Sequence, residues 1–380
     1  MPGRMIGASP RAGPHQGLSS DGPFSFPGRE VRERATAAAR ERRFLQVFLA
    51  PMLSFILRRL GQAVLVLLVV GLGAFALFQY VGDPVNNMVG QDATPEQRQQ
   101  LRADLGLDRS APLQFARFVG HALRGDFGVS LRQGREVSAL IAERLPATLE
   151  LSIAAAIVAT LFGIPLGVFA ALRRRHWDAQ AAMIVSLLGV SLPGFLIGIL
   201  LIEVFAVLLG WLPSSGRGAT VQLGDWSTGL LTVDGWRHLV LPAVALSLYQ
   251  LTLVMRLVRA EMLEVLRSDY VKFARARGLP DRIVHFRHAL RNTLIPVLTI
   301  SGLQFGNLIA FSIITETVFA WPGMGSLFIQ AVQFADVPVM AAYLCLIAVV
   351  FVVINLVVDL LYVAVDPRLR VRASMAGGGR

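Results

Sequence analysis

Residues 257–298 read LVRAEMLEVLRSDYVKFARARGLPDRIVHFRHALRNTLIPVL and separate two long apolar runs of the chain. The segment is basic, because nine Lys or Arg residues stand against four Asp or Glu residues between positions 256 and 291. Glycine and proline divide it at places that are typical of short helices joined by turns. A loop this long and this ordered is expected to contact a partner rather than to serve only as a connection.

The flanking sequence is that of a protein embedded in a membrane. Hydrophobic residues make up 54% of the chain, charged residues make up 16%, and the mean hydropathy is +0.58. A helix needs about 20 apolar residues to cross a hydrocarbon core of roughly 30 Å. Six segments meet this length, so the sequence predicts an all-α polytopic fold with transmembrane helices at residues 60–81, 145–172, 179–209, 239–255, 294–315 and 339–365.

Basic residues occupy alternate connections of these predicted helices. Arg58 and Arg59 precede the first span, three arginines at 173–175 join the second to the third, and residues 256–291 join the fourth to the fifth. The positive-inside rule therefore places both termini and the 256–292 loop in the cytoplasm. The net charge of +11 follows from this topology. Nucleic-acid binding is the weaker interpretation, because no basic patch carries interleaved aromatic residues.

The first 51 residues differ from the rest in composition. They are rich in Gly, Pro and Ser, followed by a charged run at 29–43, which predicts disorder rather than a signal peptide. A second hypothesis is that translation begins at Met52 and that residues 1–51 are not translated. The predicted organisation is an N-terminal extension at 1–51, a first transmembrane helix at 52–81, an external periplasmic loop at 82–144, a five-helix core at 145–366 and a cytoplasmic tail at 367–380.

Cysteine and histidine give no indication of a metal site. The single cysteine, Cys345, lies inside the last predicted span, so no disulfide can form within one chain. The histidines show no H-E-x-x-H spacing, and only His285 and His288 share a helical face. We expect no bound metal.

The segment at 257–298 contains its own helix signals. Ser268 and Asp269 predict the N-cap of a short helix at 270–277, Gly278 is placed to end that helix, and Pro280 blocks its continuation. A second helix is expected at 281–290, with Pro296 at the start of the fifth span, where its missing N–H costs little. Small side chains at Ala274 and Ala276 would permit close approach of another surface, and Lys272, Arg275 and Arg277 would offer charge to an acidic groove. These residues alone leave two interpretations open, a docking helix and an amphipathic helix on lipid headgroups.

The same segment resembles the cytoplasmic coupling loop of ABC-importer permeases, and more narrowly that of the oligopeptide/dipeptide/nickel permease family. General permeases of this class carry Glu-Ala-Ala, three residues, Gly, nine residues and Ile-x-Leu-Pro. This chain keeps Ala274 and Gly278 but has Lys272 at the Glu position and a His-Ala-Leu-Arg sequence from His288 in place of Ile-x-Leu-Pro. The peptide branch shares these departures. The matching residues are Asp269, Tyr270, Ala274, Arg275, Ala276, Arg277, Gly278, Leu279, His288, Ala289, Leu290, Arg291, Asn292 and Pro296.

Three further stretches resemble the same family, so that the likeness spans residues 52–370. The first is MLSFILRRLG at 52–61 with Gly82-Asp83-Pro84, and the last is the closing pattern of Asn355, Asp359, Tyr362 and Asp366-Pro367-Arg368. Between them, ETVF at 316–319, WPGMG at 321–325 and ADVP at 335–338 resemble the external segment before the last span. The family usually has Arg-Asp-Tyr-Pro at 335–338, so a role of that arginine is not carried over.

The resemblance implies a type I ABC-importer permease that forms half of a translocation pore for peptides or similar small solutes. It implies a second homologous permease subunit, two cytoplasmic ABC ATPase subunits, an external solute-binding protein and surrounding membrane lipid as partners. It also implies a coupling helix that docks the ATPase through Tyr270, Lys272, Phe273, Ala274, Arg275, Ala276, Arg277, Gly278 and Leu279, supported by His288, Arg291, Asn292 and Pro296.

The chain itself is not expected to be an enzyme or to bind a cofactor. Its only lysine, Lys272, is not preceded by the glycines of a G-x-x-x-x-G-K-[ST] phosphate loop, so ATP and Mg²⁺ are expected on the partner subunits. A secondary transporter would need repeated halves, and a membrane enzyme would need a catalytic constellation; the sequence offers neither. The substrate, and whether the pore is a homodimer or a heterodimer, stay open.

Polar residues inside the predicted spans are functional candidates, because each is costly in lipid when it has no partner. Gln304 and Asn307 lie one helical turn apart in the fifth span and are candidates for lining the pore. Helix–helix hydrogen bonding is the favoured role for Asn355 and Asp359. Pro193-Gly194 predicts a kink in the third span, of use for packing or gating.

Overall fold

The computed structural model describes residues 57–77, 94–104, 110–224 and 226–365. The chain divides into two compact units, Met1–Ser54 and Phe55–Arg380, and every described residue belongs to the second. The predicted extension at 1–51, both ends of the first predicted helix and the tail at 367–380 lie outside the described residues. The domain boundaries expected from the sequence therefore stay predictions.

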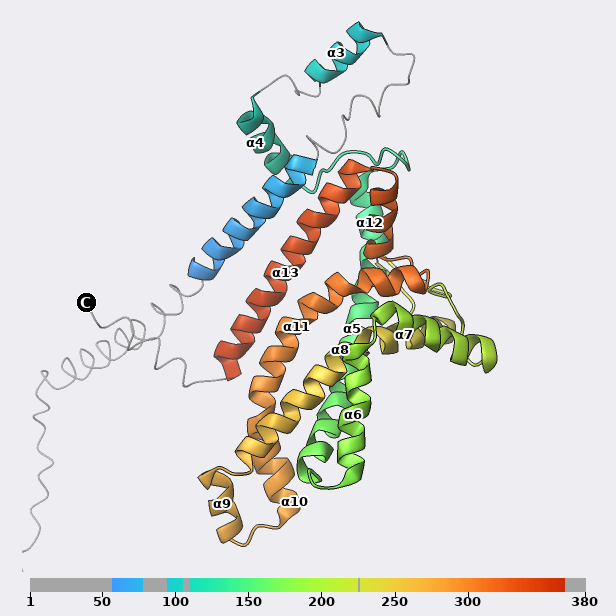
Figure 1. Ribbon diagram of the computed structural model, residues 1–380. Helices are drawn as coiled ribbons and strands as arrows, with labels where there is room; N and C mark the ends of the chain where they lie inside the picture. Colours follow the sequence, from blue (N-terminus) through green and yellow to red (C-terminus); the bar gives the residue numbers. More distant parts are fainter. Residues whose placement is uncertain (1–56, 78–93, 105–109, 225, 366–380) are drawn as a thin grey trace, which may run out of the picture. The chain divides into compact units, whose positions relative to one another are not determined.

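Five described helices are long and apolar enough to cross a membrane (Figure 1). One is Leu57–Leu77, and another is Asp281–Val318, which joins α10 (Asp281–Ile283), a π-helical segment η2 (Val284–Ala289) and α11 (Leu290–Val318). The other three are α5 (Val137–Leu172), α8 (Val233–Val265) and α13 (Val337–Val365). Each lies at a predicted span, so the apolar runs located the helices correctly.

The third predicted span is a broken helix rather than a continuous one. It consists of α6 (Trp177–Ser191), α7 (Gly194–Leu201) and the π-helical segment η1 (Ile202–Leu208), and it bends by 108° between α6 and α7. The break falls at Pro193, whose ring prevents the regular helical hydrogen bond. The kink predicted at Pro193-Gly194 is confirmed, and counting the bent pair as one span gives six.

The remaining described elements connect or cover the long helices. The described chain is not entirely helical, because it contains a two-stranded antiparallel hairpin of β1 (Val221–Leu223) and β2 (Trp226–Thr228). Val221 pairs with Thr228, and Leu223 pairs with Trp226. Thr232 caps the following helix, because its Oγ1 accepts a hydrogen bond from Gly235 N at 2.9 Å. The elements that connect or cover the long helices are α3 (Pro95–Asp104), α4 (Ala111–Ala122), β1 (Val221–Leu223), β2 (Trp226–Thr228), α9 (Asp269–Ala276) and α12 (Met324–Gln333).

The helices α5 and α8 form the central packing contact of the described chain. Glycines on α5 allow α8 to approach closely, since a Cβ at Gly167 would lie 2.6 Å from Val258 Cβ and 2.7 Å from Met255 O. Close approach through small residues is the usual basis of helix packing in membranes. Val258 is fully buried in a core cluster that also holds Val271 of α9 and Val297 of α11. The α5–α8 pair therefore positions the segment that follows α8.

Gly167→Ala is expected to lower the free energy of unfolding by about 1–3 kcal/mol, because the added methyl overlaps both a side chain and a backbone carbonyl of α8. The check is the thermal unfolding midpoint of the purified protein. Gly73→Ala is the matched control, since a Cβ there meets nothing within 4 Å. Equal midpoints for the two variants would contradict the close α5–α8 contact.

Candidate functional site

One face of α9 is seated on the chain's own core and the other is exposed. Val271 and Ala274, three residues apart, are buried against Val258 of α8 and Val284 of η2. On the outer face Phe273 is 64% exposed and Tyr270 is 48% exposed. Ala274 was expected to permit approach of another surface; it faces inward instead. Leu279 also packs on this core, whereas Lys272, Arg275, Ala276, Arg277 and Gly278 are exposed.

The end of α9 is fixed by a glycine, as the sequence predicts. Gly278 has φ +76°, a left-handed conformation that side chains rarely adopt. Its N–H donates to Arg275 O at 2.9 Å, and Leu279 N–H donates to Ala274 O at 3.4 Å, which is the Schellman arrangement. The start of α9 differs from the prediction. Ser268 occupies the N-cap position, but its hydroxyl donates to Val265 O at 2.6 Å rather than capping the helix.

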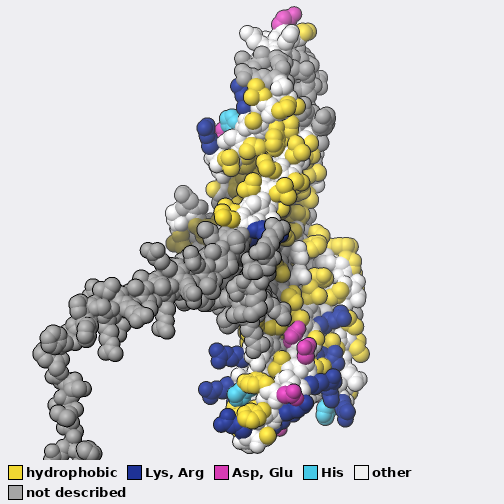
Figure 2. Space-filling view, turned by 90° about the vertical axis from the view of Figure 1, so that its left-hand side faces the viewer, with side chains coloured by type: hydrophobic (Ala, Val, Ile, Leu, Met, Phe, Trp, Pro, Cys, Tyr) yellow, Lys and Arg dark blue, Asp and Glu magenta, His cyan; other side chains and the backbone are white. Residues whose placement is uncertain are grey.

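The three basic side chains of α9 have different surroundings. Lys272 Nζ donates to Asp269 Oδ1 at 2.8 Å, and this bond holds the pKa of the Asp269 carboxyl below its usual value. Arg275 Nε lies 3.6 Å from Asp281 Oδ1. The Arg277 guanidinium lies 5.9 Å from the centre of the Phe273 ring and forms no ion pair with any described residue. Arg277 therefore carries the uncompensated charge of α9. Lys and Arg side chains gather at the end of the molecule where α9 lies (Figure 2).

A hydrogen bond ties α9 to the helix that follows it. The Tyr270 hydroxyl and His288 Nδ1 are 2.6 Å apart, and the two rings meet edge to face with centroids 5.7 Å apart. His288 lies on η2, which continues directly into α11. The contact gives His288 an atomic partner on α9, and the supporting role of His288 stays a prediction.

The helix after Gly278 differs from the one predicted. A separate second helix at 281–290 was expected, but the structure has one continuous helix from Asp281 to Val318. Pro296 consequently lies inside α11 and not at its start. The π-helical turns of η2 precede it, and Arg291 and Asn292 are exposed in the first turn of α11. The helix expected at 281–290 is therefore continuous with the fifth span, and Pro296 is tolerated within this helix rather than beginning it.

A cavity of about 460 Å³ lies where the broken span meets α8 and α11. Gln304 and Asn307 both line it, and Asn307 Nδ2 donates to Gln304 Oε1 at 2.5 Å. Gln250 of α8 also lines it, and its Oε1 is buried without a hydrogen-bond partner among the described residues. Pro193 and Gly194 form the opposite wall. The two candidate pore residues thus share one cavity with the helix break.

The other polar residues of the spans have local roles. Asp359 of α13 accepts from Arg59 of the helix Leu57–Leu77 at 2.8 Å, which confirms a helix–helix contact. Asn355 instead donates to Phe351 O of its own helix at 2.9 Å. The helix–helix bond expected for Asn355 is therefore wrong.

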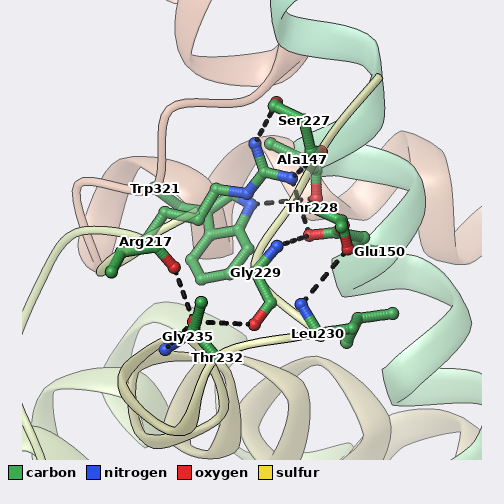
Figure 3. Close-up of polar contacts among 11 residues, drawn as sticks. Ala147, Glu150, Arg217, Ser227, Thr228, Gly229, Leu230, Thr232, Gly235 and Trp321 are labelled. Atoms are coloured by element: carbon green, nitrogen blue, oxygen red, sulfur yellow. Dashed lines mark hydrogen bonds and ion pairs between the residues drawn. The ribbon is translucent and has the colours of Figure 1, made fainter. Parts of the chain in front are cut away.

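Sequence reasoning missed a buried ion pair between Glu150 of α5 and Arg217 of the connection before β1 (Figure 3). Arg217 Nη2 lies 2.7 Å from Glu150 Oε2, and the side chains are 7% and 5% exposed. Arg217 also donates from Nη2 to Ser227 O at 2.7 Å. Glu150 carried a signal, since a carboxylate within an apolar run needs a partner. Arg217 carried none, because the two residues are 67 positions apart.

A second buried carboxylate explains the glycines of the WPGMG stretch. Glu316, in the last turn of α11, is fully buried and accepts hydrogen bonds from Thr148 Oγ1 at 2.7 Å and Ser326 N at 3.0 Å. A Cβ at Gly323 would lie 2.5 Å from the Glu316 carboxylate, and one at Gly325 would lie 2.9 Å from it. Glycine at both positions therefore lets the start of α12 pack directly against Glu316. The hydrogen bonds of Glu316 connect α11 to α5 and α12.

Cys345 and His285 are engaged in packing and in a local contact, respectively. Cys345 is half-buried in α13, and His285 lies beside Arg275 with Nε2 and Nη2 3.4 Å apart. Within the described ranges, no three His, Cys, Asp or Glu side chains are grouped so that they could hold a metal ion.

Comparison with known proteins identifies the family. The model of the "Binding-protein-dependent transport system inner membrane component" matches residues 163–371, and that of its N-terminal part matches residues 52–152. The chain is 39% identical over 320 residues to the glutathione transport system permease protein GsiC of Salmonella paratyphi A, covering 84% of this chain and 99% of the relative. It is 42% identical over 333 residues to the di/tripeptide transport system permease protein DppB of Pseudomonas aeruginosa, with the same coverage.

A solved inward-facing structure of the MetNI methionine ABC transporter matches with a TM-score of 0.49 and 18% identity, over 60% of this chain and 96% of that one. The family matches and the relatives confirm the expected resemblance to peptide-type ABC permeases. They also confirm the expected polytopic permease fold. The chain belongs to the binding-protein-dependent transport system inner membrane component family and is a multi-pass inner-membrane permease subunit of a binding-protein-dependent ABC importer.

Proposed function

We propose that this chain forms one half of a translocation pore for peptides or similar small solutes. A second homologous permease subunit supplies the other half, and an external solute-binding protein delivers the solute. Two cytoplasmic ABC ATPase subunits hold ATP and Mg²⁺ and hydrolyse the ATP, with α9 as the docking helix. The functions of the two relatives, glutathione transport and di/tripeptide transport, support a peptide-like substrate.

The contrast between the buried inner face and the exposed aromatic outer face of α9 carries the proposal. The inner face of α9 packs on three core elements, and its outer face exposes Tyr270 and Phe273. Exposed apolar side chains on a fixed helix indicate a surface that binds a partner. Aromatic and arginine side chains dominate binding energy at interfaces, and Arg277 stands beside Phe273 on this face. A purely lipid-facing helix would not need the bond to His288.

Force applied to α9 would travel along a short path. The buried contacts of Val271 and the Tyr270–His288 bond join α9 to η2, and η2 is continuous with α11. The helix Asp281–Val318 is about 57 Å long at 1.5 Å per residue, so it reaches through a bilayer from the loop to the far side. Gln304 and Asn307 lie on this same helix, so movement of α9 displaces one wall of the cavity.

The orientation follows from charge. Arg173, Arg174 and Arg175 end α5 near the same core cluster as α9, and Arg256 and Arg259 extend α8 toward it. Basic residues of short connections favour the cytoplasmic side. We therefore place α9 and both termini in the cytoplasm, facing the ATPase.

Replacing Gly278 tests whether the end of α9 matters for coupling. Gly278→Val should disfavour the native turn roughly tenfold, because a left-handed conformation costs an L-residue about 1–2 kcal/mol. A Cβ at Gly278 meets nothing within 4 Å, so the effect is one of backbone conformation and not of steric overlap. Uptake and ATPase stimulation should fall while membrane insertion is unchanged. Gly278→Asn, which tolerates this conformation, should keep most activity; unchanged transport by Gly278→Val would count against docking through α9.

The cavity lined by Gln304 and Asn307 is proposed to form part of the pore. Its uncharged polar side chains suit a path for peptide groups. Asn307→Cys in a Cys345→Ala background should react with a membrane-impermeant cationic thiol reagent many times faster than Val353→Cys, since Val353 is exposed on the outer surface of α13. Modification at position 307 should also block uptake by the assembled transporter. Equal reaction rates at the two positions would remove Asn307 from the pore.

A further inference from the structure

A second cavity, of about 290 Å³, lies between the end of α5, the first turns of α6 and the extension of α8. Its polar wall is made by Arg174, Arg259 and Gln180, and its other wall by Met183 and Ile184 together with small alanines. It is separate from the cavity of Gln304 and Asn307 and does not include any residue of α9.

The charge of this cavity is uncompensated. Neither Arg174 nor Arg259 forms an ion pair with any described residue, whereas the adjacent Arg173 is paired with Asp178 at 2.7 Å. No carboxylate lines the cavity. Arg259 Nε is buried and has no acceptor within the described part of the chain. A buried guanidinium N–H without an acceptor indicates a missing anionic partner.

The surroundings place this cavity at a membrane surface. Arg174 lies two residues after the end of α5, and α6 begins at Trp177, which is 81% exposed. Tryptophan at the end of a span is typical of the boundary between headgroups and hydrocarbon. On the apolar wall Ile184 is 65% exposed, so the cavity is continuous with a hydrophobic helix surface. Its polar end lies at headgroup level and its apolar end at acyl-chain level.

We infer that this cavity binds the headgroup of an anionic phospholipid from the leaflet on the α9 side. Arg174 and Arg259 pair with the phosphate, and Met183 and Ile184 contact the beginning of an acyl chain. Basic pockets between transmembrane helices on the cytoplasmic side are suited to such headgroups. An anionic lipid fits better than a zwitterionic one, because an amine would find no carboxylate in the lining. A soluble phosphate would leave the exposed Ile184 uncovered.

The bound lipid has a structural consequence. It joins α5 and α6 to the part of α8 that leads into α9, beside the hydrogen bond from Thr252 Oγ1 to Ser186 O at 2.7 Å. Its occupancy therefore stabilises the packing of α6 against α8.

The experiment uses the complete transporter in nanodiscs of phosphatidylcholine, with phosphatidylglycerol titrated at constant total lipid. The thermal unfolding midpoint of the wild type should rise with phosphatidylglycerol, and native mass spectrometry should detect the lipid retained on this subunit. Arg174→Gln/Arg259→Gln should weaken this response roughly 30-fold in lipid concentration, at about 1 kcal/mol for each arginine. The matched control is Arg175→Gln/Arg256→Gln, which removes two exposed charges outside the cavity, one from the α5–α6 turn and one from α8.

Equal responses of the two double variants would overturn the site, because the effect would then be one of general surface charge. If inorganic phosphate in pure phosphatidylcholine discs gives the same stabilisation, the lipid assignment is wrong. Should the double variant fail to fold, Arg174→Gln alone still decides the question. Arg174 is exposed, so this change is compatible with folding, and it should weaken the response roughly fivefold. An unaltered response would overturn the proposal.

Discussion

Phe273→Ala is expected to weaken binding of the ATPase subunits by about 30-fold or more and to uncouple ATP hydrolysis from uptake. Exposed aromatic anchors at the centre of an interface typically contribute about 2–4 kcal/mol when truncated. Phe273 is the most exposed large hydrophobic residue of α9, and Arg277 lies over its ring. The binding affinity of purified ATPase for the permease pair in detergent is the measurement, with transport-coupled ATPase activity as the second readout.

Phe162→Ala is the matched control for this change. Phe162 is 53% exposed, but it lies on α5 within the apolar part of the bundle and away from α9. The control should leave ATPase binding at the wild-type level. If Phe273→Ala and Phe162→Ala bind ATPase equally well, Phe273 is not an anchor of the interface.

Arg217→Met is expected to lower the free energy of unfolding by about 3–5 kcal/mol, because it leaves the Glu150 carboxylate buried without its cation. The loss should appear as a steep fall in thermal midpoint and in the yield of folded protein. Arg135→Met removes a guanidinium from an exposed pair with Glu143, whose N–O distance is 3.0 Å, and should cost less than about 1 kcal/mol.

The double variant Glu150→Leu/Arg217→Met distinguishes the contribution of the ion pair from that of the other contacts of Arg217. Replacing both members of a buried ion pair by apolar residues is often neutral or even stabilising, so the double variant should recover most of the stability lost by Arg217→Met. A double variant as unstable as Arg217→Met would mean that Arg217 acts through Ser227 and not through Glu150.

The features that the sequence predicted correctly are those set by local chemistry. Apolar runs located the spans, because the bilayer imposes a minimum length. Pro193 predicted the break in the third span, and Gly278 predicted the end of α9, because each effect depends on one backbone position. The position predicted for Pro296 was wrong. Proline usually stands at the start of a helix, but inside a membrane bundle α11 accommodates it.

The features that the sequence did not predict depend on tertiary contacts. Spacing indicates that Val271 and Ala274 share a face, but not that this face lies on η2. The partner of Glu150 comes from a loop 67 residues away, and one partner of Glu316, Thr148 of α5, is 168 residues away. Gln304 and Asn307 were predicted as pore residues from their polarity and from their spacing of one helical turn in the fifth span; the structure adds that both line the cavity at the helix break.

The docking role of α9 is tested most directly by photo-cross-linking from position 273. A benzophenone amino acid at position 273 of the complete transporter should cross-link to an ATPase subunit on irradiation, and the same amino acid at position 162 should not. An ATPase adduct is expected from position 273 alone. Adducts from position 273 that contain only lipid or this chain, in a transporter that still hydrolyses ATP and imports solute, would contradict it.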